Sequence, residues 1–324
     1  MATYTNIQGQ NILIVSSDPA NPTVGQIWYN TTSNALKGYV ADFGAWATGG
    51  TMSVAKGYQG SAGTQTASLS FGGFTTFPTE ITSAEEYDGT SWTAGGALPV
   101  ARQLVASAGT QTAALSAGGA VPPGSVNTNV TLEYDGSTWS PGGNLGTTRS
   151  GLAGCGTQTS GLAFGGQTPA PAVSNATEEY DGTSWTAGGN LGTAAVLQGG
   201  AGTQTAGLYA GGNNGPGVQT EEYDGTSWAA GGNMGTARRE FSSAGTQTAA
   251  LASGGQGPVT AFTVEAYDGT AWSSVANLTL GREYSGGNGT QTAAIAVGGS
   301  SPAVATTEEF TGGPTNANKT ISFS

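Results

Sequence analysis

The feature that most constrains this chain is a tetrapeptide, Gly-Thr-Gln-Thr, that occurs six times in 324 residues. Its copies are separated by 46, 47, 46, 43 and 44 residues and begin at Gly63, Gly109, Gly156, Gly202, Gly245 and Gly289. A double glycine, an acidic-aromatic cluster such as 178–181 and a tryptophan recur in the same phase, the tryptophan at Trp46, Trp92, Trp139, Trp185, Trp228 and Trp272. Six copies in phase predict a fold of six equivalent units.

Each unit predicts four short strands. In the third copy they lie near 150–155, 160–164 and 176–180 and around Trp185, with a tight turn at Asp181-Gly182, where glycine accepts positive φ without steric cost. No segment has an apolar period of 3.6 residues, so we expect no helices. Four strands in a period in the mid-forties are typical of a propeller blade. We therefore predict an all-β, six-bladed β-propeller.

The predicted first strand of each unit contains small residues, for example Gly-Ser-Ala at 60–62 and Ala-Ser-Ala at 106–108. Small residues suit the strand nearest a narrow axis. The tryptophans and tyrosines of the outer strands would supply the bulk that packs one blade against the next.

The order of these residues resembles that of kelch repeats. The third copy has the double glycine Gly165-Gly166, then Tyr180 and Trp185, and a basic residue opens most first strands. That basic position reads Lys56, Arg102, Arg149, Ala195, Arg238 and Arg282, so it departs once, at Ala195. The resemblance covers roughly residues 46–313 and implies a kelch-like propeller. We expect the tryptophans and the basic residues to be structural.

A second resemblance concerns residues 17–37, which include Ser17-Asp18-Pro19 and Gly25-Gln26-Ile27-Trp28-Tyr29-Asn30. This leader is similar to the N-terminal segment of uncharacterised tail, fibre or capsid-surface proteins of marine tailed bacteriophages. In those proteins it precedes arrays of Gly-Thr-Gln-Thr and Tyr-Asp-Gly-Thr-Ser-Trp. The resemblance implies a virion protein that is made in the host cytoplasm.

The ends of the chain lie outside the repeat. We expect residues 1–35 to form an attachment segment with a hairpin of 26–30 and 36–40, and residues 36–324 to form the propeller. The simplest closure places the Trp46 strand in the sixth blade. A rival closure uses the alternating segment 319–324 as a strand.

Composition excludes several classes of function. The net charge is −12 with only 8 basic residues, so a nucleic-acid partner is not expected. No signal peptide and no apolar stretch of membrane-spanning length is evident. The chain contains no histidine, which removes Ser-His-Asp catalysis and His-ligated zinc. We predict no enzymatic activity, no catalytic residue, no metal and no cofactor. Calcium on the acidic clusters is the alternative for metal.

The segments between the double glycine and the acidic cluster differ among the six copies and hold most of the prolines. They share one face of the predicted ring with the connections between blades, and function concentrates in variable loops on a rigid scaffold. The predicted binding residues there are Phe74, Phe77 and Phe262. The glutamines of the six uniform turns are expected to bridge blades, and the acidic clusters to form a solvated outer edge.

We therefore interpret the chain as a virion structural or adhesion module. Residues 1–35 would contact other virion proteins, and the propeller would bind a host-surface glycan or protein or decorate the particle, with a homo-oligomer also compatible. The alternatives are a cellular interaction scaffold and a carbohydrate-active enzyme. For the enzyme, the candidate carboxylates outside the clusters are Glu80, Glu240 and Glu283.

Overall fold

The computed structural model describes residues 12–20, 26–76, 79–169, 172–213, 217–257, 261–299, 303–312 and 315–321. Within these ranges the chain forms strands, turns and loops, and no helix occurs. The chain divides into two compact units. The larger unit is Gly44–Thr311, and the smaller combines Met1–Phe43 with Gly312–Ser324.

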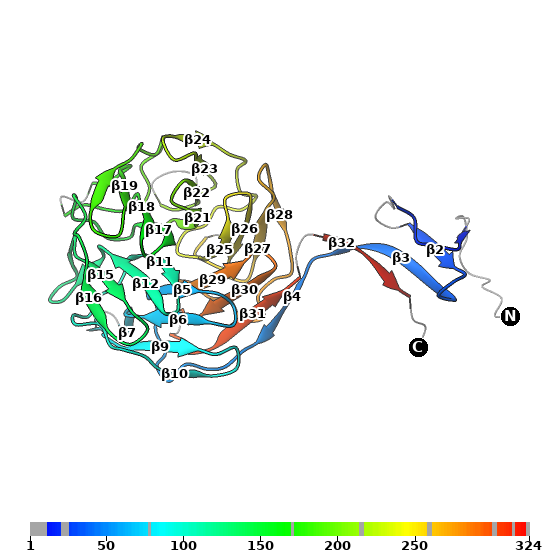
Figure 1. Cartoon of the computed structure of the whole chain (residues 1–324), viewed down its shortest axis with the longest axis horizontal. Coiled ribbons are helices and arrows are strands. Elements are labelled where there is room, and N and C mark those ends of the chain that lie inside the picture. Colours follow the sequence, from blue (N-terminus) through cyan, green and yellow to red (C-terminus); the bar gives the residue numbers. More distant parts are fainter. Residues whose placement is uncertain are drawn as a thin grey trace. The chain divides into compact units, whose positions relative to one another are not determined.

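The larger unit contains six four-stranded antiparallel sheets in the part of the chain that the structure describes, arranged in a ring with the first strand of each nearest the centre (Figure 1). From the centre outward, the first three sheets are β5 (Gly60–Gly63), β6 (Ser68–Phe71), β9 (Ala84–Tyr87) and β10 (Trp92–Ala94); β11 (Ala106–Thr110), β12 (Ala113–Ala117), β15 (Thr131–Tyr134) and β16 (Trp139–Pro141); and β17 (Ala153–Thr157), β18 (Ser160–Phe164), β19 (Thr177–Tyr180) and β20 (Trp185–Ala187).

The other three sheets are β21 (Gly199–Thr203), β22 (Ala206–Ala210), β23 (Thr220–Tyr223) and β24 (Trp228–Ala230); β25 (Ser242–Thr246), β26 (Ala249–Ser253), β27 (Val264–Tyr267) and β28 (Trp272–Ser274); and β29 (Gly286–Thr290), β30 (Ala293–Val297), β31 (Thr307–Thr311) and β4 (Ala45–Thr48). The sixth sheet thus takes its outermost strand from the start of the unit. Trp46 lies directly opposite Phe310 in the register of β4 and β31.

Backbone hydrogen bonds join the six sheets in a cycle at the centre. One residue just before each first strand has φ between 55° and 64° and donates its N–H to the matching carbonyl of the preceding sheet, at 2.8 to 3.1 Å. The order is Leu104 to Tyr58, Gly151 to Leu104, Leu197 to Gly151, Glu240 to Leu197, Tyr284 to Glu240 and Tyr58 to Tyr284. The sixth step returns to the first sheet, so the all-β architecture is propeller-like.

Polar side chains of the repeat hold each sheet against the one before it. The tyrosine that ends a third strand donates its hydroxyl to a glutamate of the preceding sheet, as Tyr180 does to Glu133 at 2.5 Å. The turn glutamine donates to two carbonyls of the preceding sheet, as Gln158 does to Ala114 and Tyr134. The expected bridging role of these glutamines is therefore observed.

The six tryptophans are half-buried or buried and donate their indole N–H across the same interfaces. Trp92, Trp185, Trp228 and Trp272 each donate to a threonine hydroxyl of the preceding sheet at 2.9 Å. Where that threonine is replaced by alanine or valine, Trp139 and Trp46 donate instead to the backbone carbonyls of Gly96 and Ala276. Each of these indole N–H groups therefore has an acceptor, which is a threonine hydroxyl in four sheets and a backbone carbonyl in two.

The basic residues form buried ion pairs inside their own sheets. Arg149, Arg238 and Arg282 lie 2.6 to 2.8 Å from Glu178, Glu265 and Glu308, and Lys56 lies 3.4 Å from Glu85. Each arginine also donates to a carbonyl of the double glycine, as Arg149 does to Gly165. Burial opposes ionisation of Glu308, but hydrogen bonds from Thr279 and Arg282 outweigh it and lower its pKa.

Two sheets break this pairing in opposite ways. In the second sheet Leu132 stands where the others have glutamate, and Arg102 is buried with no ion pair among the described residues. Burial lowers the pKa of Arg102 to about 10. In the fourth sheet Ala195 replaces the arginine, and Tyr209 packs in the same buried cluster, directly across from Glu221. The other sheets have only serine or alanine in place of Tyr209, so the phenol compensates for the missing side chain.

The prediction that the acidic clusters form a solvated outer edge is wrong for their glutamates. The first acidic residue is buried against a basic side chain or backbone N–H groups, and the glutamate that follows it accepts from a neighbouring tyrosine. Only the aspartates are exposed, and each accepts from N–H groups of its own turn, as Asp181 does from Thr183 and Ser184. Close packing between sheets converts acids that look like surface residues into buried acceptors.

The smaller unit is one sheet in the order β1 (Leu13–Val15), β2 (Ile27–Asn30), β3 (Ala35–Asp42) and β32 (Thr315–Thr320). Asp18 organises it: one carboxylate oxygen accepts from Trp28 at 3.0 Å and Asn30 at 2.7 Å, and the other pairs with Lys37 at 2.8 Å. Trp28 is fully buried. Residues of the leader segment 17–37 thus stabilise this sheet.

The structure corrects the expected ends of the propeller. The hairpin of 26–30 and 36–40 is present as β2 and β3, but the division falls at residues 43 and 44 rather than 35 and 36. The Trp46 strand completes the sixth sheet, whereas the C-terminal segment pairs as β32 with β3 and takes no part in the ring. Both ends of the chain are needed to make the smaller sheet, which sequence alternation alone does not reveal.

The ion pairs predict unequal effects of replacing two arginines with methionine. Arg149→Met leaves Glu178 buried without its cation and should reduce the free energy of unfolding by about 3 to 5 kcal/mol. Arg102→Met leaves no carboxylate without a partner, so it should reduce the free energy of unfolding clearly less. Urea denaturation of both variants measures the difference, and equal losses would show that the pairing with glutamate is not what stabilises Arg149.

Candidate functional site

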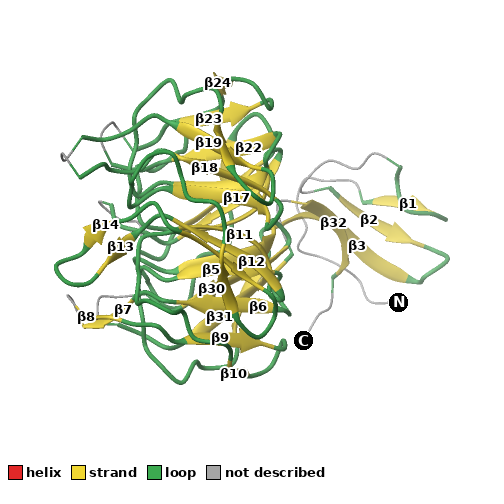
Figure 2. Ribbon diagram, turned by 60° about the vertical axis from the view of Figure 1, so that its left-hand side comes forward, coloured by secondary structure: helices red, strands yellow, loops and turns green. Residues whose placement is uncertain are grey.

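The central hydrogen-bonded ring lies at the face that carries the variable loops. At five of the six ring positions, the preceding residue bridges to the residue after a double glycine, as Gly57 does to Phe74 and Gln103 to Ala120. Those residues begin the variable segments. Two of the segments form hairpins, β7 (Phe74–Thr76) with β8 (Thr79–Glu80) and β13 (Ala120–Val121) with β14 (Val126–Asn127), which project from the same side of the ring (Figure 2).

We call the six ring residues the rim, which consists of Tyr58, Leu104, Gly151, Leu197, Glu240 and Tyr284. Their backbones are equivalent, with the same left-handed conformation and the same cyclic hydrogen bonds. Their side chains are not: two tyrosines, two leucines, a glutamate and a glycine. A non-glycine residue is uncommon in this conformation, and such residues cluster at functional positions. The rim is therefore a uniform backbone frame that presents four kinds of side chain at six equivalent positions.

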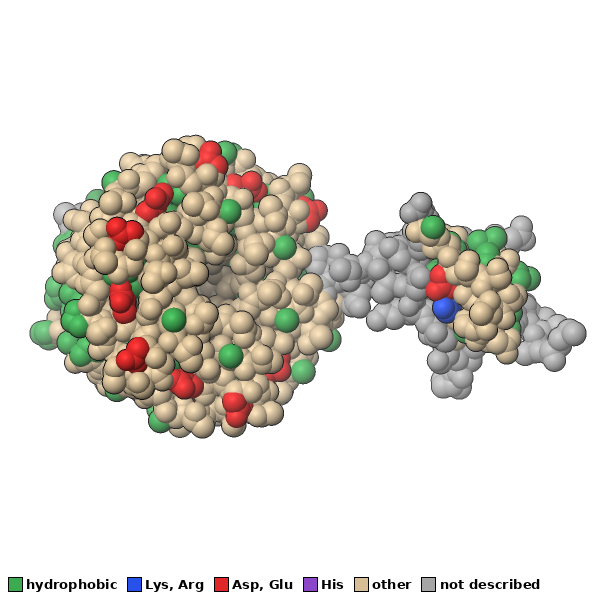
Figure 3. All heavy atoms as spheres, viewed as in Figure 1, with side chains coloured by type: hydrophobic (Ala, Val, Ile, Leu, Met, Phe, Trp, Pro, Cys, Tyr) green, Lys and Arg blue, Asp and Glu red, His purple; other side chains and the backbone are tan. Residues whose placement is uncertain are grey.

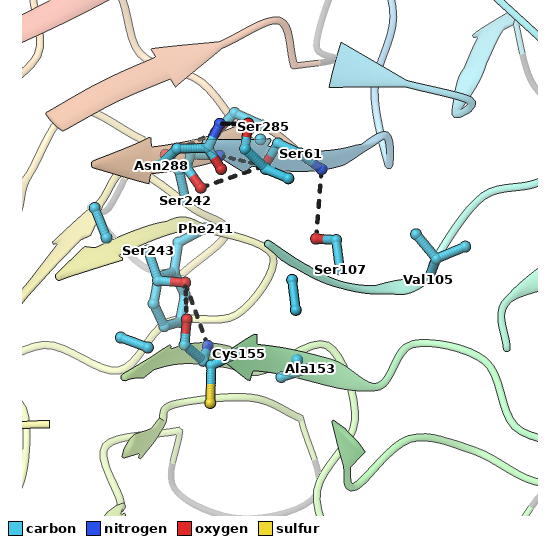
Figure 4. A pocket seen from close by; sticks show the side chains of 18 of the residues that line it. Ser61, Val105, Ser107, Ala153, Cys155, Phe241, Ser242, Ser243, Ser285 and Asn288 are labelled. Carbon is cyan, nitrogen blue, oxygen red and sulfur yellow. Dashed lines mark hydrogen bonds between the residues drawn. The ribbon is translucent and has the colours of Figure 1, made fainter. Parts of the chain in front are cut away.

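The rim residues line a cavity of about 290 Å³ along the axis of the ring. Figure 3, which views the ring from the side opposite the loop hairpins, shows a hollow at its centre. The walls of the cavity are the first strands, which contribute Ser61, Ser107, Gly154, Gly200, Ser243 and Gly287 at corresponding positions. Hydroxyls bridge neighbouring strands where glycine leaves room: Ser61 donates to Gly287 at 3.2 Å and Ser243 to Gly200 at 2.8 Å (Figure 4). The cavity is thus narrow and lined by backbone and small polar groups.

Three rim residues from different sheets form a polar cluster. Tyr58 donates its hydroxyl to Glu240 Oε1 at 2.7 Å, and its ring lies 4.3 Å from that of Tyr284 between centroids. The Glu240 side chain is only 5% exposed. Its Oε2 atom accepts no hydrogen bond among the described residues, and the Nε of Arg239 lies 3.8 Å from it.

Burial dominates the electrostatics of this cluster. It raises the pKa of Glu240, although the hydrogen bond from Tyr58 and the charge of Arg239 oppose the shift. Burial also raises the pKa of Tyr58, as does its bond to Glu240. Gln256 connects the outer groups, donating to Glu283 and Tyr284 at 3.3 Å and accepting from Arg239. The cluster therefore holds a carboxylate in a site that disfavours its charge unless a cation is supplied.

The three phenylalanines predicted to bind a ligand are placed differently. Phe74 is 7% exposed and packs against Tyr58 with 5.5 Å between ring centroids, so it supports the rim instead of facing a ligand. Phe262 is 51% exposed on the loop face but does not line the cavity. Phe77 lies outside the described residues. Of the two that the structure describes, neither lines the cavity.

The other acidic candidates differ in their surroundings. Glu80 accepts from Ser125 at 2.6 Å and Gln103 at 3.2 Å, bridging the loops of the first two sheets. Glu283 accepts from Gln256 and is not among the described residues that line the cavity, but its charge contributes to the raised pKa of Glu240. Cys155 is buried, which raises its pKa to about 12.

Within the described ranges, no three of the Cys, Asp and Glu side chains are grouped as a metal site would need. No helix in those ranges is long and apolar enough to cross a membrane. The arrangement at the rim suits noncovalent binding: an acceptor carboxylate, two aromatic rings and two leucines surround the opening of the cavity.

Sequence reasoning identified Glu240 but missed the rest of the rim. The missing signal is a position two residues after each basic repeat position, for example Tyr58 after Lys56 and Leu104 after Arg102. This position varies from copy to copy inside an otherwise uniform segment. An alignment of the six repeats shows this variable position, whereas the long loops give no sign of it.

The larger architecture has relatives among solved structures. The chain is similar to the structure of YjhT, with a TM-score of 0.67 and 13% sequence identity over 83% of this chain and 99% of that chain. At this identity the likeness concerns the fold alone. No protein-family model matches the chain, and no curated protein matches its sequence.

The raised pKa of Glu240 predicts a pH-dependent difference between the protein and Glu240→Gln. The folded state binds this proton more tightly than the unfolded state, so the free energy of unfolding should fall as pH rises from about 4.3 through the folded pKa. Glutamine does not ionise, so Glu240→Gln should not show this fall. The variant should therefore become more stable relative to the protein as pH rises through that range.

Urea denaturation between pH 4 and about 8 measures this difference. The tyrosines around Glu240 do not account for it, because Tyr58 and Tyr284 have raised pKa values and stay neutral in this range. A difference that is constant with pH would show that Glu240 keeps an ordinary pKa.

Proposed function

We propose that Gly44–Thr311 is a six-bladed, kelch-like propeller that works as a non-enzymatic binding module, with the rim as its recognition site. The observation that carries the proposal is the rim itself: six equivalent backbones that carry different side chains at the opening of a cavity. A purely structural ring would repeat one side chain, as the bridging glutamines do. The variable loops on the same face extend the recognition surface.

We further propose that the module belongs to a phage virion and binds a host-surface glycan or protein. The support is the likeness of residues 17–37 and of the repeat array to structural proteins of marine phages, with Asp18, Trp28 and Lys37 serving as the stabilising contacts of the smaller sheet. On the face of the ring that Figure 3 shows, acidic side chains but no lysine or arginine are visible, which fits a surface that avoids nucleic acid.

The smaller unit is the proposed attachment segment. Its edge strand β1 exposes Leu13 by 45% and Ile14 by 69%, and an edge strand with exposed apolar residues is suited to pairing with another chain. The partner would be another virion protein.

Attachment through β1 predicts that Ile14→Lys abolishes incorporation into particles while the propeller stays folded. The full-length variant is supplied in trans, and virions are purified and probed for it. The control is Val126→Lys, which changes an apolar side chain of similar exposure, 58%, on β14. Normal incorporation of Ile14→Lys would remove β1 from the attachment surface.

Recognition at the rim predicts that Leu104→Arg and Leu197→Arg reduce binding of the full-length protein to host cells at least about tenfold, because each fills the opening with a charged side chain. The control is Thr112→Arg, in an exposed uniform turn. Cell binding is measured by flow cytometry, before and after periodate or protease treatment, which separates a glycan from a protein receptor. Unchanged binding by both leucine variants would contradict the assignment, and no binding by the protein itself would leave decoration of the particle as its role.

A further inference from the structure

The axial cavity has an unbalanced charge. Among the described residues that line it, Glu240 is the one with a charged side chain, and no lysine or arginine is present. The other lining groups are the tyrosines of the rim, amides such as Asn288, serines, apolar side chains such as Leu104 and Phe241, and glycine backbone. In the low-dielectric surroundings of a protein cavity, a single ionised carboxylate sets the sign of the potential. Glu240 is therefore the described lining group that can make the cavity negative.

The carboxylate of Glu240 is also incompletely satisfied. One oxygen accepts from Tyr58, whereas Oε2 is buried without a hydrogen-bond donor among the described residues. The neighbouring Arg239 does not remove this deficit: its Nε is 3.8 Å away and its side chain is 37% exposed, with its terminal nitrogen bonded to Gln256. A buried acceptor with a free lone pair is costly unless a bound donor completes it.

The surroundings of Glu240 suit a cation of small cross-section. The rings of Tyr58 and Tyr284 lie beside the carboxylate, and aromatic faces attract ammonium groups. Below the rim, the first strands line the axis with glycine backbone and with the hydroxyls of Ser61 and Ser243, which bridge neighbouring strands. A cavity of about 290 Å³ has room for an unbranched chain.

We propose that the rim binds a primary ammonium group on an unbranched aliphatic chain, with Glu240 as its counter-ion and Tyr58 and Tyr284 beside it. The inference rests on the proposed function, whose recognition site it makes specific for one chemical group. Such a group is found on free diamines and on lysine side chains of proteins. The carboxylate of Glu240 would repel an anionic ligand, and a neutral ligand would leave the carboxylate without a counter-ion.

The test is isothermal titration of the full-length protein with 1,5-diaminopentane, and with pentane-1,5-diol as the uncharged chain of equal length. We expect one diamine to bind per chain and the diol to show no heat. Glu240→Gln should weaken diamine binding by about tenfold to a hundredfold, the effect of losing one charged hydrogen bond. Glu80→Gln, which removes a carboxylate on the same face outside the cavity, should leave the affinity unchanged.

Thermal melts of both variants confirm that they remain folded. Equal binding of diol and diamine, absence of diamine binding, or unchanged affinity in Glu240→Gln would each overturn the proposal. Nα-acetyl-lysine N-methylamide distinguishes the sources: binding as tight as that of the diamine indicates a lysine side chain, and much weaker binding indicates a free amine. If the leucine variants lose cell binding while the diamine does not bind, the proposed recognition site stands and the ammonium inference alone fails.

Discussion

The packing of one sheet against the next is the constraint on which the larger unit depends. A four-stranded sheet of short strands cannot bury both of its faces alone, so each must be covered by a neighbour. The contacts are specific: the tyrosine hydroxyl, the turn glutamine and the tryptophan indole of one sheet each donate to the sheet before it. Because these donors point in one direction around the ring, every sheet needs a predecessor. The first finds it in the sixth, where Tyr87 donates to Glu309.

This cyclic dependence explains where the chain tolerates change. Where the threonine acceptor is replaced, the indole N–H keeps a hydrogen bond, because Trp139 donates to a backbone carbonyl instead. Loss of an arginine in the fourth sheet coincides with a tyrosine on the adjacent strand, in the same buried cluster. At the rim, by contrast, the cyclic hydrogen bonds are made by the backbone alone, so closure of the ring does not depend on the identity of the side chains. Tyr58, Leu104 and Glu240 can differ there without cost to closure, and a binding site can arise on a symmetrical frame.

Much of the fold was predictable because a repeat turns one local pattern into six observations. The turns at Asp-Gly, the four strands per copy and the placement of Trp46 in the last sheet follow from the phase of the motifs. The acidic clusters were misjudged because Glu178 and Glu133 look like surface residues until the neighbouring tyrosine and the buried arginine are seen beside them. Phe74 was misjudged for the converse reason: an aromatic residue in a variable loop is covered by Tyr58 from another part of the same sheet.

The sequence by itself determined an all-β chain of six equivalent four-stranded units, the residues that join them and a separate N-terminal segment. Periodicity encodes these features, since each copy repeats the same short-range turn and strand signals. Only the tertiary structure decided which residues meet at the centre. Tyr58, Glu240 and Tyr284 belong to three different repeats and meet at the rim. Contacts across the closure between β29 and β5 join residues that are 226 positions apart in the chain. It also decided that the C-terminal strand pairs with β3, because pairing between distant edges depends on where folding brings them, which a local pattern does not contain.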